Sequence, residues 1–133
     1  MGSWSDKYSV NIEIIDEQHK ELFNILDNCY ELLLKNKDDD KYDKIITILE
    51  ELKNYTIYHF KTEEEFMKKN GYSKFLSHKF AHDAFIEQIN GFDLYSIDSD
   101  QKKSINDLLD IVSNWIKFHI LETDKNIHKY LKV

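Results

Sequence analysis

The sequence contains no proline, only three glycines and no arginine, because all 18 basic residues are lysine. Proline and glycine interrupt helices and shape tight turns, so their scarcity favours long helices over a turn-rich β fold. Without arginine, the chain lacks the planar guanidinium that grips a phosphate through two parallel hydrogen bonds. The formal net charge of −7 agrees with this, and we expect no nucleic-acid partner.

Cysteine and long apolar runs are also scarce. The single cysteine, Cys29, excludes an internal disulfide and any cysteine-cluster metal site. No apolar run reaches the roughly 18 residues of a membrane span, and the N-terminus lacks the apolar core of a signal peptide. We therefore expect a cytoplasmic protein with no membrane association. A length of 133 residues, 41% of them hydrophobic, suits one domain covering residues 1–133.

Apolar residues recur with the 3.6-residue period of an amphipathic helix in four blocks, at about 16–36, 41–69, 73–90 and 100–121. Helices of this kind with short connections favour an all-α, antiparallel up-down-up-down four-helix bundle. Asp16 and Ser73 are placed to cap the first and third helices. Gly71 suits the left-handed position that ends the second helix.

Two further segments carry expectations about packing. Residues 1–15 form an extended N-terminal arm, which we expect to lie across the helices and pack through Trp4 and Tyr8. In the third helix the predicted apolar stripe consists of Leu76, Phe80, Phe85 and Ile89.

Five of the six histidines fall at one level of this predicted bundle. His19 lies about 26 Å before the end of the first helix, and His59 lies about 27 Å after the start of the second, at 1.5 Å per residue. The remaining histidines return to the same level on the third and fourth helices, together with two carboxylates. The full set is His19, His59, Glu63, His78, His82, His119 and Asp124.

A single histidine or one i,i+4 pair on a helix usually has a structural role. Five imidazoles and two carboxylates at one level of a core, however, would be left unsatisfied without a bound ion. Seven ligands are too many for one zinc, and they fit two metal ions that share two carboxylates. The nitrogen-rich set suits iron better than calcium or magnesium. Glu64 and Glu65, which follow Glu63, are interpreted as a solvated face.

The spacing of His119 and Asp124 conflicts with a regular helix. Five residues turn an α-helix by about 500°, which leaves the two side chains about 140° apart. Both can face the centre only if the helix distorts, so we predict a wide turn or a break around Leu121–Thr123.

Four segments resemble the hemerythrin family, in particular its bacterial single-domain members. They are "IDEQHKELF" (15–23), "HFKTEEEFM" (59–67), "HKFAH" (78–82) and "WIKFHILETD" (115–124). The resemblance covers essentially the whole chain and fills every ligand position. Ser73 is one departure, since many relatives carry proline there.

The resemblance implies a non-haem di-iron centre with an oxo or hydroxo bridge. One iron would be held by His78, His82 and His119, and the other by His19 and His59. Glu63 and Asp124 would bridge the two, and dioxygen would bind at the open position of the second iron. An apolar pocket over that position would be lined by Leu22, Phe60, Trp115, Ile116 and Ile120.

The implied function is reversible dioxygen binding for storage, delivery or scavenging. Five of the seven ligands are neutral imidazoles, which disfavours the high-valent iron of carboxylate-rich oxygenases, so we expect no enzymatic activity. Two alternatives stay open. One is oxygen or redox sensing with an unidentified protein partner in trans, and the other is a di-iron enzyme that handles nitric oxide or peroxide. Metal storage would need the same ligands. We expect the chain to be a monomer.

Overall fold

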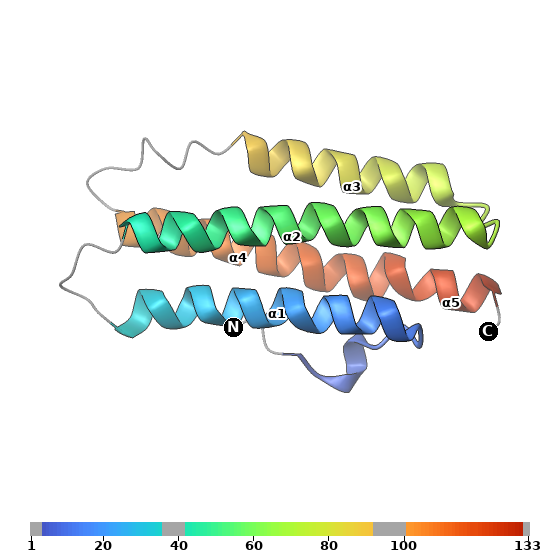
Figure 1. Ribbon diagram of the computed structural model, residues 1–133, viewed down its shortest axis with the longest axis horizontal. Helices are drawn as coiled ribbons and strands as arrows, with labels where there is room; N and C mark the ends of the chain where they lie inside the picture. Colours follow the sequence, from blue (N-terminus) through green and yellow to red (C-terminus); the bar gives the residue numbers. More distant parts are fainter. Residues whose placement is uncertain (1–3, 36–41, 92–100, 132–133) are drawn as a thin grey trace.

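The computed structural model describes residues 4–35, 42–91 and 101–131, and every regular element in these ranges is helical. Four long helices lie side by side and alternate in direction, which confirms the predicted antiparallel bundle (Figure 1). The short helix α5 continues the line of α4 beyond a π-helical turn. The elements are η1 (Asp6–Tyr8), α1 (Glu13–Lys35), α2 (Tyr42–Lys69), α3 (Phe75–Asn90), α4 (Gln101–His119), η2 (Ile120–Asp124) and α5 (Lys125–Leu131).

The core is formed by the apolar stripes that the helical period predicts. α1 packs against α2 and α4, and α2 packs against α3. Side chains such as Leu26, Leu52 and Leu109 are buried along this axis, and Cys29 is buried with them as a small apolar side chain. The predicted helix limits at 36, 41 and 100 lie outside the described residues. Within the described ranges, no helix is both long enough and apolar enough to cross a bilayer.

The N-terminal arm packs through the two aromatic residues that the sequence indicated. Tyr8 is buried, and the rings of Trp4 and Tyr8 both contact Phe23 of α1, with centroid distances of 5.8 and 4.9 Å. The arm is not extended throughout, because Asp6–Tyr8 form a short 3-10 turn.

Asp16 has a different role from the predicted cap. Helix α1 begins three residues earlier, at Glu13, so Asp16 already lies inside the first turn. Its carboxylate accepts hydrogen bonds from the Ser9 hydroxyl (2.5 Å) and the Val10 backbone N–H (2.8 Å). Asp16 therefore fastens the arm to α1.

The turn between α2 and α3 follows one prediction and departs from another. Gly71 has a φ of 67°, the left-handed conformation expected at the end of a helix. Ser73 does not cap α3, because the N-cap position falls on Lys74 and no side chain caps it. The helix thus starts one residue later than it would if Ser73 were its N-cap.

The predicted apolar stripe of α3 was wrong for Leu76 and Phe80, which are 78% and 75% exposed. His78 and His82 face the bundle, and each lies two residues from its apolar neighbour, about 200° around the helix. Once the histidines point inward, Leu76 and Phe80 must point outward. Phe85 is in phase with His78 and is buried as predicted.

Candidate metal centre

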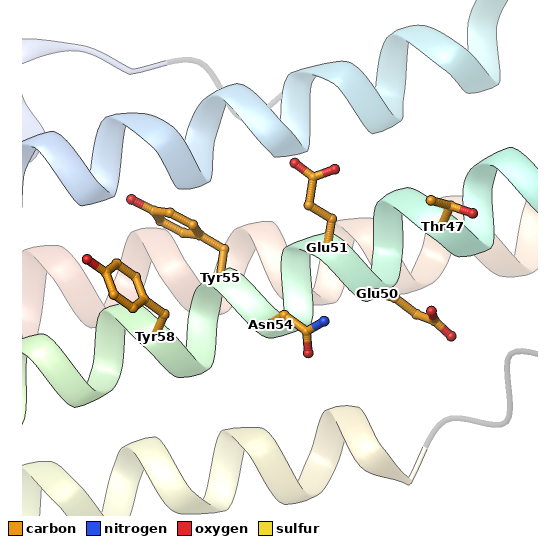
Figure 2. A pocket seen from close by; sticks show the side chains of 6 residues that line it. All are labelled: Thr47, Glu50, Glu51, Asn54, Tyr55 and Tyr58. Carbon is orange, nitrogen blue, oxygen red and sulfur yellow. The ribbon is translucent and has the colours of Figure 1, made fainter.

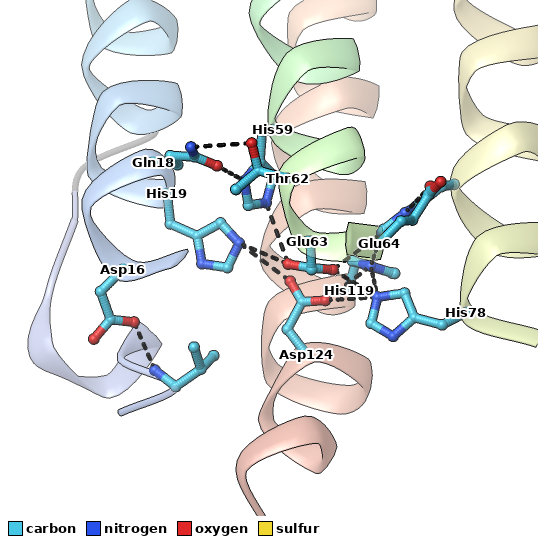
Figure 3. A network of polar contacts seen from close by, with 12 residues as sticks. Asp16, Gln18, His19, His59, Thr62, Glu63, Glu64, His78, His119 and Asp124 are labelled. Carbon is cyan, nitrogen blue, oxygen red and sulfur yellow. Dashed lines mark hydrogen bonds and ion pairs between the residues drawn. The ribbon is translucent and has the colours of Figure 1, made fainter. Parts of the chain in front are cut away.

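All seven predicted ligand residues meet in the bundle interior, toward the end of the bundle where α2 leads into α3. Figure 3 shows His19, His59, Glu63, His78, His119 and Asp124 pointing toward one another. Every one of these side chains is buried, and those of Glu63, His82 and Asp124 are at most 1% exposed. They come from α1, α2, α3, α4 and the π-helical turn. They form two groups that share Glu63 and Asp124, and each group could hold a metal ion. The groups are the three-histidine pocket (His78, His82 and His119 with the two carboxylates) and the two-histidine pocket (His19 and His59 with the same carboxylates).

The three-histidine pocket has the spacing of a coordination sphere. The Nε2 atom of His119 lies 3.0 Å from that of His82 and 3.1 Å from that of His78. Metal–imidazole bonds of about 2.1 Å at right angles separate neighbouring nitrogens by about 3.0 Å. The three rings therefore converge on a point that a cation can occupy.

The two carboxylates are oriented so that each faces both pockets. Glu63 directs Oε1 at His78 (2.7 Å) and His82 (3.2 Å), and Oε2 at His59 (3.3 Å) and His19 (3.7 Å). The two carboxylate oxygens of Asp124 also face different pockets. Its Oδ1 lies 2.9 Å from His78 and 3.0 Å from His119, whereas its Oδ2 lies 3.2 Å from His19. One oxygen of each carboxylate thus serves each pocket, the arrangement that two bridged ions require.

The buried carboxylates of the centre need positive charge beside them. None of the four carboxylate oxygens of Glu63 and Asp124 accepts a well-directed hydrogen bond from the described residues. Leaving such groups unsatisfied in a core costs several kcal/mol, of the order of 1–3 kcal/mol each or more when charged. A pair of divalent ions would satisfy these oxygens and the imidazole nitrogens together.

The pKa shifts show where protons sit when no metal is bound. Burial lowers the pKa of His19, but contacts with Asp124 and Glu63 outweigh burial and raise that pKa to about 9. The same balance raises the pKa of His78 to about 9. Burial raises the pKa of the Glu63 carboxyl, yet its histidine neighbours hold that pKa well below the ordinary value. Without metal, protons supply the positive charge that metal ions would otherwise provide.

The π-helical turn at Ile120–Asp124 brings His119 and Asp124 into the same centre. The Lys125 N–H donates to the carbonyl of Ile120, five residues back, where a regular helix would reach back four. This confirms the distortion predicted from the five-residue spacing, and it takes the form of a wide turn. The chain then resumes as α5, so the helical path extends beyond the predicted end near residue 121.

Two side chains that were not predicted accept hydrogen bonds from the outer ring nitrogens of two of the histidines. The Nδ1 atom of His59 lies 2.7 Å from Oε1 of Gln18, and Nδ1 of His82 lies 2.8 Å from Oε2 of Glu64. Both oxygens accept, so each ring carries its proton on Nδ1 and directs the lone pair of Nε2 into the centre. The interpretation of Glu64 as part of a solvated face was therefore wrong. Glu65 is exposed as expected.

The five residues predicted to line an apolar pocket each lie within four positions in the sequence of a predicted ligand. Leu22, Ile116 and Ile120 are buried, and the larger two are aromatic rings that pack on imidazoles. Phe60 stacks on His82 at 3.8 Å, and Trp115 stacks on His119 at 4.5 Å. Both stacked contacts are with histidines of the three-histidine pocket, and they hold these imidazoles in place, whereas the Phe60 ring is 6.0 Å from His59. An apolar lining for dioxygen stays a prediction.

A surface pocket that lies mostly in the N-terminal half of α2 is separate from the centre. It is formed by one helix and contains none of the seven ligand residues, and we assign it no part in metal binding (Figure 2). Its lining residues are Thr47, Glu50, Glu51, Asn54, Tyr55 and Tyr58.

Comparisons with known proteins find relatives in sequence and a solved structure with a similar fold. A family model described as the hemerythrin HHE cation binding domain matches residues 10–131. A bacteriohemerythrin from Clostridium acetobutylicum is 45% identical over 94% of this chain and 97% of its own length. A bacteriohemerythrin from Pseudomonas aeruginosa is 28% identical over 91% of this chain and 75% of its own. The crystal structure of a wild-type hemerythrin superposes with a TM-score of 0.78 at 25% identity, covering 98% of both chains.

Proposed function

The chain belongs to the hemerythrin family, and we propose that its two pockets hold a non-haem di-iron centre that binds dioxygen reversibly. The observation that carries this proposal is the division of Glu63 and Asp124, each of which turns one oxygen to each pocket. A single-ion site would not need both oxygens of both carboxylates. The seven ligands we propose are His19, His59, Glu63, His78, His82, His119 and Asp124.

Iron fits the donor set of this chain. Five imidazole nitrogens with two carboxylates are a borderline set, whereas calcium and magnesium favour shells made of oxygen alone. Bound iron would supply the electrons that pass reversibly to dioxygen. The protein contributes a rigid frame, because the rings of His59 and His82 are fixed by hydrogen bonds on their outer nitrogens.

The two pockets differ in their number of candidate ligands, and the pocket with fewer ligands leaves a coordination position for dioxygen. Five residues converge on the three-histidine pocket and four on the two-histidine pocket. We therefore propose that dioxygen binds on the side of His19 and His59. Leu22 and Ile120 are 1% exposed, so water reaches this level of the core poorly, and exclusion of water favours a reversible reaction.

We propose a binding role in preference to catalysis. The carboxylates that meet at the centre bridge both pockets, and neither is left over to move a proton to or from a substrate. The neutral imidazoles that make up most of the donor set also disfavour high-valent iron. The monomeric state and the cytoplasmic location expected from the sequence stay predictions, as does a protein partner for a sensing role.

The proposal is tested by removing and restoring dioxygen. Protein purified with its metal is reduced without air, exposed to dioxygen and then purged, while iron content and the visible spectrum are recorded. Two irons per chain and an absorption band that forms and vanishes over repeated cycles are the expected result. Irreversible oxidation in the first cycle would reject the carrier role, and a chain that binds only zinc would reject the di-iron centre.

A further inference from the structure

The hydrogen bonds from Nδ1 of His59 and Nδ1 of His82 have nearly equal lengths, but their acceptors differ in charge. Oε1 of Gln18, a neutral amide oxygen, accepts from His59 at 2.7 Å. Oε2 of Glu64, a carboxylate oxygen, accepts from His82 at 2.8 Å. His59 belongs to the two-histidine pocket and His82 to the three-histidine pocket, so each pocket has one imidazole with a different kind of supporting acceptor.

A charged acceptor changes the ligand more than a neutral one. Hydrogen bonds to an ionised oxygen are roughly twice as strong as those between neutral groups. An imidazole that donates to a carboxylate gains electron density on its other nitrogen and becomes a more basic metal ligand. We propose that Glu64 and Gln18 are positioning residues that set the two pockets apart, with Glu64 strengthening metal binding in the three-histidine pocket.

The surroundings of Glu64 leave its charge in place. Lys79 Nζ lies 3.9 Å from Oε1 of Glu64, but it lies closer to Asp83, at 2.8 Å, and its side chain is 42% exposed. An ion pair at this distance on an open surface contributes little. The lysine therefore does not cancel the carboxylate that faces His82.

The ring of His82 is also held so that this hydrogen bond acts on the metal position. Phe60 stacks on it with an interplanar angle of 2°, which prevents the imidazole from turning away. Glu64 and Phe60 line a surface pocket of about 260 Å³ between α2 and α3, together with Ile57, Lys61, Asp83 and Ile86. Because Glu64 borders this pocket, glutamine fits at position 64 without disturbing the core.

This inference rests on the metal centre of the proposed function and is independent of dioxygen binding. It is tested with Co²⁺ added to metal-free protein, with two dissociation constants fitted to the visible absorption. The variants are Glu64→Gln and Gln18→Glu, with Glu65→Gln as a control that removes the same charge from the neighbouring exposed residue. His59→Ala takes a ligand from the two-histidine pocket only, and so identifies which binding step belongs to it.

Glu64→Gln is expected to weaken Co²⁺ binding in the three-histidine pocket about 10–100-fold, the usual effect of losing a supporting hydrogen-bond partner. Gln18→Glu should tighten binding in the two-histidine pocket, and Glu65→Gln should match the wild type. Equal constants for Glu64→Gln and Glu65→Gln in a chain that binds two ions would overturn the inference and leave the di-metal centre intact. A wild-type chain that binds no Co²⁺ would overturn both.

Discussion

The π-helical turn offers a direct test of how Asp124 reaches the centre. Five residues separate His119 from Asp124, and the turn accommodates one more residue than a regular helical turn. Deleting the exposed Glu122 reduces the separation to four residues, or about 400°, so a regular helix would then place both ligands within about 40° of each other. We expect this deletion variant to keep the bridging carboxylate and to bind two metal ions.

An alanine inserted after Glu122 should have the opposite effect. It adds about 100° of rotation, which turns Asp124 and the fully buried Ile127 away from the bundle interior. Exposing Ile127 alone should lower the free energy of unfolding by about 1.5–3 kcal/mol. Loss of Asp124 from both pockets should also reduce the metal content of the purified protein.

The assay combines metal content per chain with urea unfolding of the metal-free protein. An alanine inserted after Lys129, beyond the last ligand, controls for the general cost of an insertion near the C-terminus. The argument from helical phase predicts that the deletion retains metal and the Glu122 insertion loses it. If the deletion variant lost metal as fully as the insertion variant, the wide turn itself, and not the phase that it restores, would be placing Asp124.

Three further predictions concern the histidines of the centre and the N-terminal arm. His59→Ala removes one of the two imidazoles on the proposed dioxygen side, so it should abolish dioxygen binding while helical circular dichroism and one metal ion per chain are retained. In metal-free protein the raised pKa values of His19 and His78, about 9, keep both rings protonated at pH 7.5. Metal loading should therefore release about two protons per chain, measurable with a pH indicator in weak buffer, and affinity should rise as pH increases towards 9. Asp16→Ala removes two hydrogen bonds that fasten the N-terminal arm and should lower the free energy of unfolding by about 1–3 kcal/mol, measured by urea denaturation.

The bundle could be predicted because its signals are periodic and extend over many residues. The scarcity of glycine and proline, the four apolar blocks and Gly71 all favour the same arrangement of helices. Helix ends were less predictable. Asp16 and Ser73 have the side chains of capping residues, yet the structure uses the carboxylate of Asp16 to hold the arm and places Lys74 at the start of α3.

The convergence of the seven proposed ligand residues was predictable for a related reason. Helical rise and spacing fix the level and face of each residue, so His19 and His59 could be matched across two helices before any contact was known. The same rule governs α3. Apolar character alone predicts Leu76 and Phe80 in the core, but their phase opposes that of His78 and His82, and both are exposed.

The supporting residues could not be predicted from phase alone, because they lie between faces. Gln18 precedes His19, and Glu64 follows Glu63, so each is turned about 100° from a ligand on its own helix. That rotation points each side chain towards the neighbouring helix, where Gln18 meets His59 on α2 and Glu64 meets His82 on α3. In both pairs, the residue that hydrogen-bonds the imidazole is therefore adjacent in sequence to a proposed ligand on a different helix. A polar residue next to a ligand in sequence is thus a better candidate for hydrogen-bonding an imidazole than a helical projection suggests. For this reason Glu64 contacts His82 whereas Glu65, in the same run of acidic residues, is exposed.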